Sequence, residues 1–214
     1  MSTAPLGFRP TSSLPDVPAI GIGTLGYRFM GKAHANAYQR LPLFFWPPLL
    51  RPRLVAICGR QEDAVAAAAQ RYGYEGYYTD WRAMLDDPRI ALFDNCASAD
   101  GHGEPTIAAA QAGKHVFCEK PLALNAADAL RMWQAAAQAN PSDPTPHLEL
   151  AQLYQARAAA QPSSQLNYML LAGQHLEAVL ELRPTDRDLA ERVRALYYEA
   201  ASIASRAGDP AGAL

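Results

Sequence analysis

One short run of residues constrains the fold of this chain more than any other feature. Gly26-Tyr27-Arg28-Phe29-Met30-Gly31 lies between an apolar segment, residues 19–25, and a helical pattern over residues 30–40. A glycine directly after a strand permits a tight turn, and a second glycine five residues later lets the helix pack closely on the strand. The run therefore predicts a strand, a tight turn and a helix whose start binds a ligand; a plain strand-to-helix turn with chance glycines and no binding role is the alternative.

Strand and helix patterns alternate from residue 19 to about residue 123. Short apolar runs with β-branched residues are typical of buried parallel strands, and alanine-rich segments with acidic residues in the first turn are typical of helices. This alternation predicts a doubly wound parallel sheet with helices on both faces. We expect strands at residues 19–25, 54–59, 76–78, 90–96 and 115–118, and helices at residues 30–40, 61–72, 81–85, 104–112 and 126–139. Asp80 is expected to cap the third of these helices.

In such a fold the ligand lies beyond the carboxyl ends of the strands, where the strand order reverses. The amide groups at the start of the first helix would face a diphosphate there. We therefore predict dinucleotide binding by Gly26, Arg28, Phe29, Met30 and Gly31. The usual middle glycine of such a motif is Arg28 here, so either its side chain adds charge to the phosphates or binding is weakened.

The end of the second strand bears on the type of dinucleotide. NAD-binding folds place a carboxylate near this point for the ribose hydroxyls, whereas an arginine suits the extra phosphate of NADP. Here the strand ends Cys58-Gly59-Arg60. We predict that Gly59 and Arg60 contact the cofactor and that NADP is preferred over NAD; a solvated arginine is the alternative.

Composition excludes several other classes of protein. A net charge of −2 among 214 residues provides no basic surplus for nucleic acid. The three cysteines form no CxxC pair, so neither a disulfide framework nor a structural zinc site is indicated, and the cytoplasm is the expected compartment. No apolar run is long enough to span a membrane. Residues 1–18 carry proline, serine and threonine without an apolar core and are expected to form a disordered arm.

Two longer stretches carry a family resemblance. GYRFMGKAHANAY and DNCASADGHGEPTIAAAQAGKHVFCEKPLALNAADA resemble, in order and spacing, the N-terminal half of the Gfo/Idh/MocA oxidoreductases. The resemblance spans about residues 19–133 and implies NAD(P)-dependent oxidation or reduction of a sugar, a polyol or a related carbonyl compound. It implies a Rossmann domain, which we place at residues 19–139.

The resemblance also assigns site residues. In the family the lysine of the Glu-Lys-Pro signature lies close to nicotinamide and substrate, which makes Lys120, with Glu119, the candidate catalytic pair. A lysine beside a carboxylate just past a strand can transfer a proton or orient a substrate; a surface turn is the alternative. Glu119 and Pro121 complete the signature and are expected near the cofactor.

The loop after the fourth predicted strand, residues 96–102, lines the cofactor in the family. This implies contacts from Ser98 and His102, although Ser98-Ala99 replaces the Pro-Asn pair of many members. His34 and His102 also match positions where the family often has histidine, but a packing or capping role is the simpler interpretation. Their scattered spacing predicts no metal site.

The chain from residue 140 onward departs from the family, whose members continue into a second α/β domain that carries substrate contacts. Here the pattern is helical and repeats with an offset of 43 residues, predicting a small all-α domain at residues 140–214 that resembles tetratricopeptide repeats. Such repeats have a period of about 34 residues, so the first helix of each unit would have to be longer than usual. Two amphipathic helical hairpins with coincidental prolines are the alternative. A protein partner bound by these helices, with the α/β domain as scaffold, is the rival to the enzyme hypothesis. The repeated residues are Pro141, Asp143, Leu150, Leu153 and Tyr154, matched by Pro184, Asp186, Val193, Leu196 and Tyr197.

Overall fold

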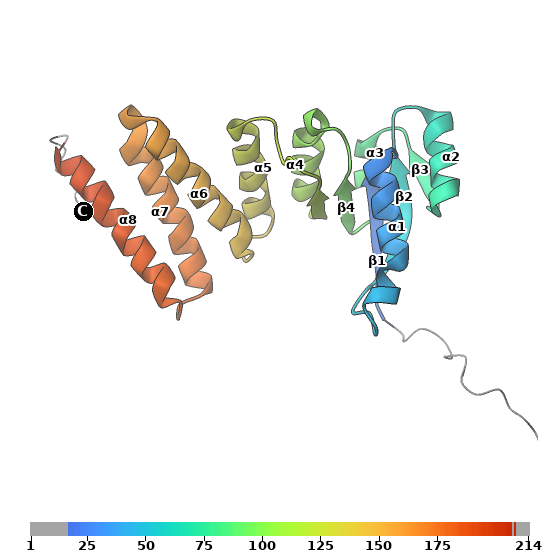
Figure 1. Ribbon diagram of the computed structural model, residues 1–214, viewed down its shortest axis with the longest axis horizontal. Coiled ribbons are helices and arrows are strands. Elements are labelled where there is room, and N and C mark those ends of the chain that lie inside the picture. Colours follow the sequence, from blue (N-terminus) through green and yellow to red (C-terminus); the bar gives the residue numbers. More distant parts are fainter. Residues whose placement is uncertain (1–16, 207, 209–214) are drawn as a thin grey trace, which may run out of the picture. The chain divides into compact units, whose positions relative to one another are not determined.

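The computed structural model describes residues 17–206 and residue 208, and the chain divides into two compact units. The first unit is residues 1–96 and the second is residues 97–214. Figure 1 labels the helices and strands of both units. The predicted arm at residues 1–18 lies outside the described residues except for Val17 and Pro18.

The first unit is built on four parallel strands: β1 (Ala19–Leu25), β2 (Arg51–Cys58), β3 (Gly76–Tyr78) and β4 (Leu92–Asn95). The prediction of β1 and β3 is confirmed to the residue, whereas β2 starts three residues earlier than expected and β4 is shorter. The five strands of the sheet have the order β3-β2-β1-β4-β5, where β5 is His115–Cys118. The order reverses between β1 and β4, as the predicted doubly wound topology requires.

Three helices connect these strands: α1 (Phe29–Phe44), α2 (Glu62–Tyr72) and α3 (Trp81–Leu85). Helix α1 runs four residues further than predicted and contains Pro42. Helix α2 carries two acidic residues in its first turn and ends at Gly73, whose φ of 78° lets the chain leave the helix. The side chain of Asp80 caps α3 by accepting a hydrogen bond from the amide of Arg82, as predicted.

The core of the first unit lies between the sheet and its helices. Most of its buried side chains come from β1, β2, α1 and α2. Tyr74 belongs to this core and donates a hydrogen bond from its hydroxyl to Thr24 Oγ1 at 2.7 Å. The remaining members are Ile22, Ala35, Leu54, Ile57, Val65 and Ala69.

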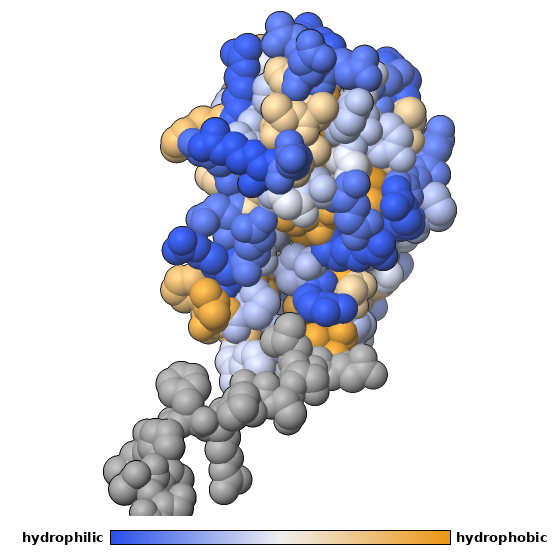
Figure 2. All heavy atoms as spheres, turned by 90° about the vertical axis from the view of Figure 1, so that its right-hand side faces the viewer, coloured by the Kyte–Doolittle hydropathy of each residue, from blue (hydrophilic) through white to orange (hydrophobic). Residues whose placement is uncertain are grey.

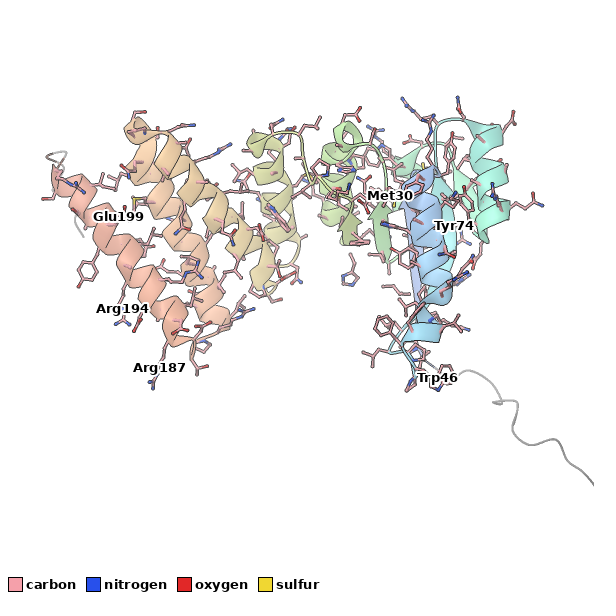
Figure 3. The ribbon with its side chains drawn as sticks, viewed as in Figure 1. Met30, Trp46, Tyr74, Arg187, Arg194 and Glu199 are labelled. Carbon is pink, nitrogen blue, oxygen red and sulfur yellow. The ribbon has the colours of Figure 1, made fainter. Side chains whose placement is uncertain are left out.

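An apolar segment at the end of α1 is exposed. Six large hydrophobic side chains between residues 43 and 50 are each at least 45% exposed, among them Phe44 and Trp46. In Figure 2, where this unit faces the viewer, hydrophobic atoms gather at the lower end, and Figure 1 draws the α1–β2 connection at that end. Figure 3 shows Trp46 there, at the opposite end of α1 from Met30.

The described part of the second unit contains β5 and five α-helices: α4 (Gly103–Gln111), α5 (Ala126–Ala139), α6 (Pro144–Ala160), α7 (Gln165–Leu182) and α8 (Arg187–Arg206). Two short 3₁₀ turns, residues 99–101 and 162–164, precede α4 and α7. The prediction of β5 and of helix 126–139 is confirmed to the residue. Within the described residues no helix is long and apolar enough to cross a membrane.

Helices α5 to α8 pack consecutively along the chain, as Figure 1 shows. Of the residues in the predicted repeat, Leu150, Tyr154, Val193 and Leu196 are buried in this helical core. The region is therefore helical as expected.

A polar contact lies among the helices of the second unit. His147 Nδ1 on α6 lies 3.0 Å from His175 Nδ1 on α7, and the His175 ring stacks on Tyr154. Burial, and then the neighbouring His147, lowers the pKa of His175.

Candidate functional site

The carboxyl ends of the first four strands meet at one edge of the sheet. Leu25 at the end of β1 is in register with Cys58 of β2 and with Asn95 of β4, and Cys58 is in register with Tyr78 of β3. The amide of Gly26 donates to the carbonyl of Cys58 at 2.9 Å, which fixes the turn after β1 against the end of β2. This is the edge where doubly wound folds bind their ligands.

Both glycines of the β1–α1 turn are required by geometry. Gly26 has a φ of 102°, a conformation that side-chain-bearing residues rarely adopt. A Cβ on Gly31 would lie 1.8 Å from the carbonyl oxygen of Gly26, so the start of α1 packs directly on the turn. The predicted tight turn and close helix packing are thus confirmed.

The start of α1 suits an anion. The first intrahelical hydrogen bond runs from the amide of Lys32 to the carbonyl of Arg28, so the amides of Phe29, Met30 and Gly31 precede it. Among the described residues no side chain caps this helix, and its first turn holds no acidic group. Uncapped amides at the positive end of the helix dipole are a binding site for phosphate. Arg28 itself is exposed at the N-cap position, and Figure 3 marks Met30 in this turn.

The end of β2 is covered by an aromatic ring. A Cβ on Gly59 would lie 2.3 Å from two carbons of the Tyr27 ring, so only glycine lets this ring pack there without a shift. The Tyr27 hydroxyl donates to Gln61 Oε1 at 3.2 Å, and the Tyr72 hydroxyl donates to the Tyr27 carbonyl at 3.3 Å. The predicted cofactor residue Arg60 follows Gly59 and is exposed.

His102 and Ser98 lie in the second unit, in the loop that precedes α4. The His102 ring is buried, with Nδ1 2.8 Å from the Pro121 carbonyl oxygen and Nε2 3.0 Å from that of Ala97. Ser98 begins the 3₁₀ turn, where its carbonyl accepts from the amide of Gly101 at 2.7 Å. His102 therefore ties this loop to the Glu-Lys-Pro turn through backbone contacts.

The Glu119-Lys120-Pro121 turn follows β5 directly. Glu119 Oε2 accepts a hydrogen bond from the amide of Lys120 at 3.1 Å, and the side chain of Lys120 is exposed. Both residues line a cavity of about 590 Å³ within the second unit, together with β5 and residues of α5 such as Trp133. A cavity of this size suits a small-molecule ligand.

The predicted site residues thus fall into two groups. The fold brings Gly26, Arg28 to Gly31, Gly59 and Arg60 to the strand ends of the first unit. Ser98, His102, Glu119, Lys120 and Pro121 belong to the second unit, where His102 and Pro121 are in contact.

Sequence analysis missed the role of Asp94. His34 Nδ1 lies 3.0 Å from both carboxylate oxygens of this fully buried residue, and Tyr38 donates to it at 3.1 Å. A usable signal was that Asp94 lies within a predicted strand, residues 90–96, directly after four apolar residues. Tyr27 was also missed, because its contact with Gly59 joins positions 32 residues apart.

Comparisons with known proteins agree with this geometry. The Gfo/Idh/MocA family model, described as an oxidoreductase family with an NAD-binding Rossmann fold, matches residues 20–141. Levoglucosan dehydrogenase of Pseudarthrobacter phenanthrenivorans is 41% identical over 121 residues, which are 56% of this chain and 31% of that protein. Myo-inositol 2-dehydrogenase of Thermotoga maritima is 36% identical over 111 residues, 52% of this chain and 31% of that protein.

Solved structures give the same result. An oxidoreductase domain protein from Kribbella flavida superposes with a TM-score of 0.56 and 40% identity, covering 67% of this chain and 40% of that one. A levoglucosan dehydrogenase in complex with NADH gives 0.55 and 38%, covering 66% of this chain and 40% of that one. The chain spans about a third of the length of the curated relatives it matches. With more than half of its residues matched, this chain belongs to the Gfo/Idh/MocA oxidoreductase family, whose NAD-binding Rossmann fold it carries.

Proposed function

We propose that this chain binds a nicotinamide dinucleotide at the β1–α1 turn and serves the oxidation or reduction of a sugar or polyol. The start of α1 carries this proposal. Among the described residues no side chain caps this helix end, and it packs through Gly31 on the turn at Gly26, so its first amides are placed to bind a diphosphate. The relatives named levoglucosan and inositol dehydrogenase support the substrate class. The domain that would do this is residues 19–139, a range supported by the family match at residues 20–141.

Arg28 replaces the glycine at which backbone usually approaches the phosphates. We propose that its exposed guanidinium reaches the diphosphate and contributes a charge-assisted hydrogen bond. Arg28→Ala should then weaken dinucleotide binding, whereas Arg28→Gly should recover part of the loss by restoring close backbone approach. If Arg28→Ala binds as tightly as the wild type, the side chain has no such role.

Arg60 supports a preference for NADP. It lies just past the end of β2, where the adenosine ribose binds in this fold. NAD-binding folds usually have an aspartate or glutamate near this point, whereas here the strand is followed by Gly59 and Arg60. Fluorescence titration of NADPH and NADH should show tighter NADPH binding by the wild type and a selective loss of it in Arg60→Ala. Arg71→Ala, at the other end of α2, is the matched control. Equal affinity for both cofactors in wild type and Arg60→Ala would remove this preference.

Lys120, with Glu119 beside it, is proposed to hold or move a proton at the substrate oxygen. Its exposed ammonium group lines a ligand-sized cavity, and the Glu119 carboxylate is bonded to its amide. When bound, the nicotinamide ring supplies the hydride chemistry. His102 acts as a positioning residue, since it holds the loop at residue 97 to residue 121.

A screen of sugars and polyols with NADP⁺ and NAD⁺ tests this function. We expect Lys120→Ala to abolish turnover while leaving the dinucleotide Kd unchanged, and Lys114→Ala, which lines the same cavity, to keep turnover. Cofactor binding without turnover on any substrate would limit the function to binding. Absence of dinucleotide binding would refute the proposal.

A second candidate function concerns the helical region, residues 140–214. Helices α6 and α8 begin 43 residues apart, at Pro144 and Arg187, and Asp143 and Asp186 each accept a hydrogen bond from a first-turn amide. This supports a tetratricopeptide-like repeat that binds a protein partner. Figure 3 marks the exposed residues Arg187, Arg194 and Glu199 on α8. A partner retained by the full chain, and lost on reversing the charges of these residues without loss of dinucleotide binding, would favour this function.

A further inference from the structure

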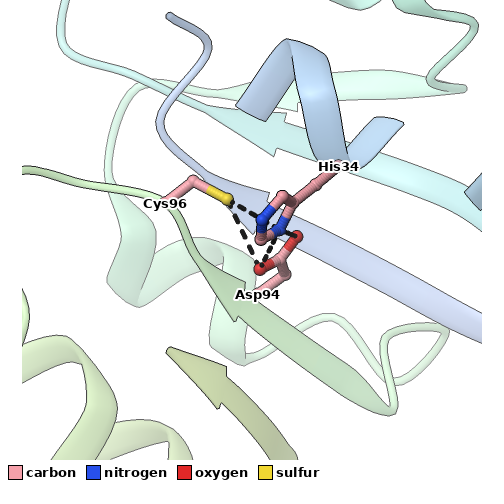
Figure 4. A group of neighbouring side chains, drawn as sticks. All are labelled: His34, Asp94 and Cys96. Carbon is pink, nitrogen blue, oxygen red and sulfur yellow. Dashed lines mark hydrogen bonds and ion pairs between the residues drawn. The ribbon is translucent and has the colours of Figure 1, made fainter. Parts of the chain in front are cut away.

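Three side chains that can bind a metal ion gather at the end of β4. They are His34 from α1, Asp94 from β4 and Cys96 just after β4. Figure 4 shows the imidazole, the carboxylate and the thiol turned toward one another. The Cys96 Sγ lies 3.1 Å from His34 Nδ1 and 3.4 Å from Asp94 Oδ1, and His34 Nδ1 lies 3.0 Å from Asp94 Oδ1. All three belong to the first unit.

The geometry does not suit a catalytic relay. In a nucleophile–histidine–acid triad the histidine contacts the nucleophile through one ring nitrogen and the acid through the other. Here Cys96 and Asp94 both approach the same nitrogen, Nδ1 of His34. A ring nitrogen has either one proton to donate or one lone pair to accept with. Nδ1 of His34 therefore cannot take a proton from Cys96 while it donates a hydrogen bond to Asp94, which is what a relay requires. Convergence of a nitrogen, an oxygen and a sulfur on one point is instead how a metal ion is bound.

We propose that His34 Nδ1, Asp94 Oδ1 and Cys96 Sγ bind a divalent cation of the zinc class. Tetrahedral ligands at zinc bond lengths of about 2.0–2.3 Å lie roughly 3.3–3.6 Å from one another. The observed separations of 3.0, 3.1 and 3.4 Å need to open by only a few tenths of an ångström. The mixture of imidazole, carboxylate and thiolate favours zinc, cobalt or nickel over magnesium or calcium.

Charge and hydrogen bonding support the site. Asp94 is completely buried, and its carboxylate together with a Cys96 thiolate balances the two charges of the cation, so the bound site is neutral. The other carboxylate oxygen, Oδ2, accepts a hydrogen bond from the Tyr38 hydroxyl at 3.1 Å. Hydrogen bonds of this kind orient a metal-binding carboxylate. With Oδ2 bonded to Tyr38, Oδ1 is the oxygen that would bind the metal. The His34 side chain is 13% exposed, which leaves a route for the ion and for a water in the fourth position.

Anaerobic titration of the metal-free full chain with Co²⁺ tests the proposal, because thiolate ligation produces an absorption band in the near ultraviolet. We expect this band at one equivalent, displaced by Zn²⁺, and one zinc per chain by elemental analysis after desalting. Cys96→Ser should abolish the band and weaken Zn²⁺ binding by about 10-fold or more. Asp94→Asn should weaken binding similarly.

Cys58→Ser is the matched control, since Cys58 is another buried cysteine of the same unit that takes no part in the group. It should keep both the band and the stoichiometry. No thiolate band in the wild type, or an unchanged band in Cys96→Ser, would overturn the proposal even if another variant failed to fold. Zinc bound without a thiolate band would place the ion elsewhere, such as at the His147–His175 pair, and would also overturn it.

Discussion

Gly31→Ala tests the β1–α1 turn most directly. The added Cβ would lie 1.8 Å from the Gly26 carbonyl oxygen, which is backbone and cannot rotate away. Since unstrained carbon–oxygen contacts are about 3.3 Å, the start of α1 would have to move by roughly 1.5 Å. Overpacking of this kind costs about 1–3 kcal/mol of folding free energy.

The same movement displaces the amides that we propose to face the diphosphate. Functional groups must be held within about 0.5 Å of their productive position, so a shift three times larger should remove much of the binding. We expect the Kd for NADPH or NADH to rise about 10-fold or more, which corresponds to about 1.4 kcal/mol or more.

Urea unfolding and cofactor titration by fluorescence measure the two effects separately. Gly76→Ala, in β3, is the control, because a Cβ there meets nothing within 4 Å. It should leave both the unfolding midpoint and the Kd near those of the wild type. A Gly31→Ala protein with wild-type stability and affinity would refute the close packing of helix on turn, whereas lost stability with unchanged affinity would refute the phosphate site alone.

Three further predictions follow from other contacts. The pKa of His175 is lowered in the folded chain, so the unfolded chain binds more protons and stability should fall as pH drops below about 6.5; urea midpoints from pH 7.5 to 5 should decline less in His175→Gln. Gly59→Ala should destabilise by pushing the Tyr27 ring aside, and Tyr27→Ala should suppress part of that loss in a double-mutant cycle of unfolding free energies. Burial raises the pKa of the Cys58 thiol to about 12; mass spectrometry at pH 8 should therefore find iodoacetamide on the half-buried Cys118 before Cys58, and the reverse order would contradict this.

The amino-acid sequence by itself determined the local elements. Strand β1, strand β5 and helix 126–139 were predicted to the residue, because alternating apolar patterns, glycine stops and capping residues act over a few positions. The roles of Gly26 and Gly31 could also be predicted, since a turn between a strand and a helix restricts the backbone locally. Boundaries such as the end of α1 at Phe44 were less predictable, because Pro42 was tolerated within the helix.

Only the tertiary structure decided which side chains meet. His34 and Asp94 are 60 residues apart, and His102 reaches the carbonyl of residue 121 across a helix and a strand. No periodic pattern encodes such pairs, because they depend on strand order and on which face of each helix turns inward. The sequence therefore specified a Rossmann domain and its β1–α1 turn, while packing of β1, β4 and α1 created the His34–Asp94–Cys96 group. The spacing of the histidines and cysteines along the chain had not predicted such a group.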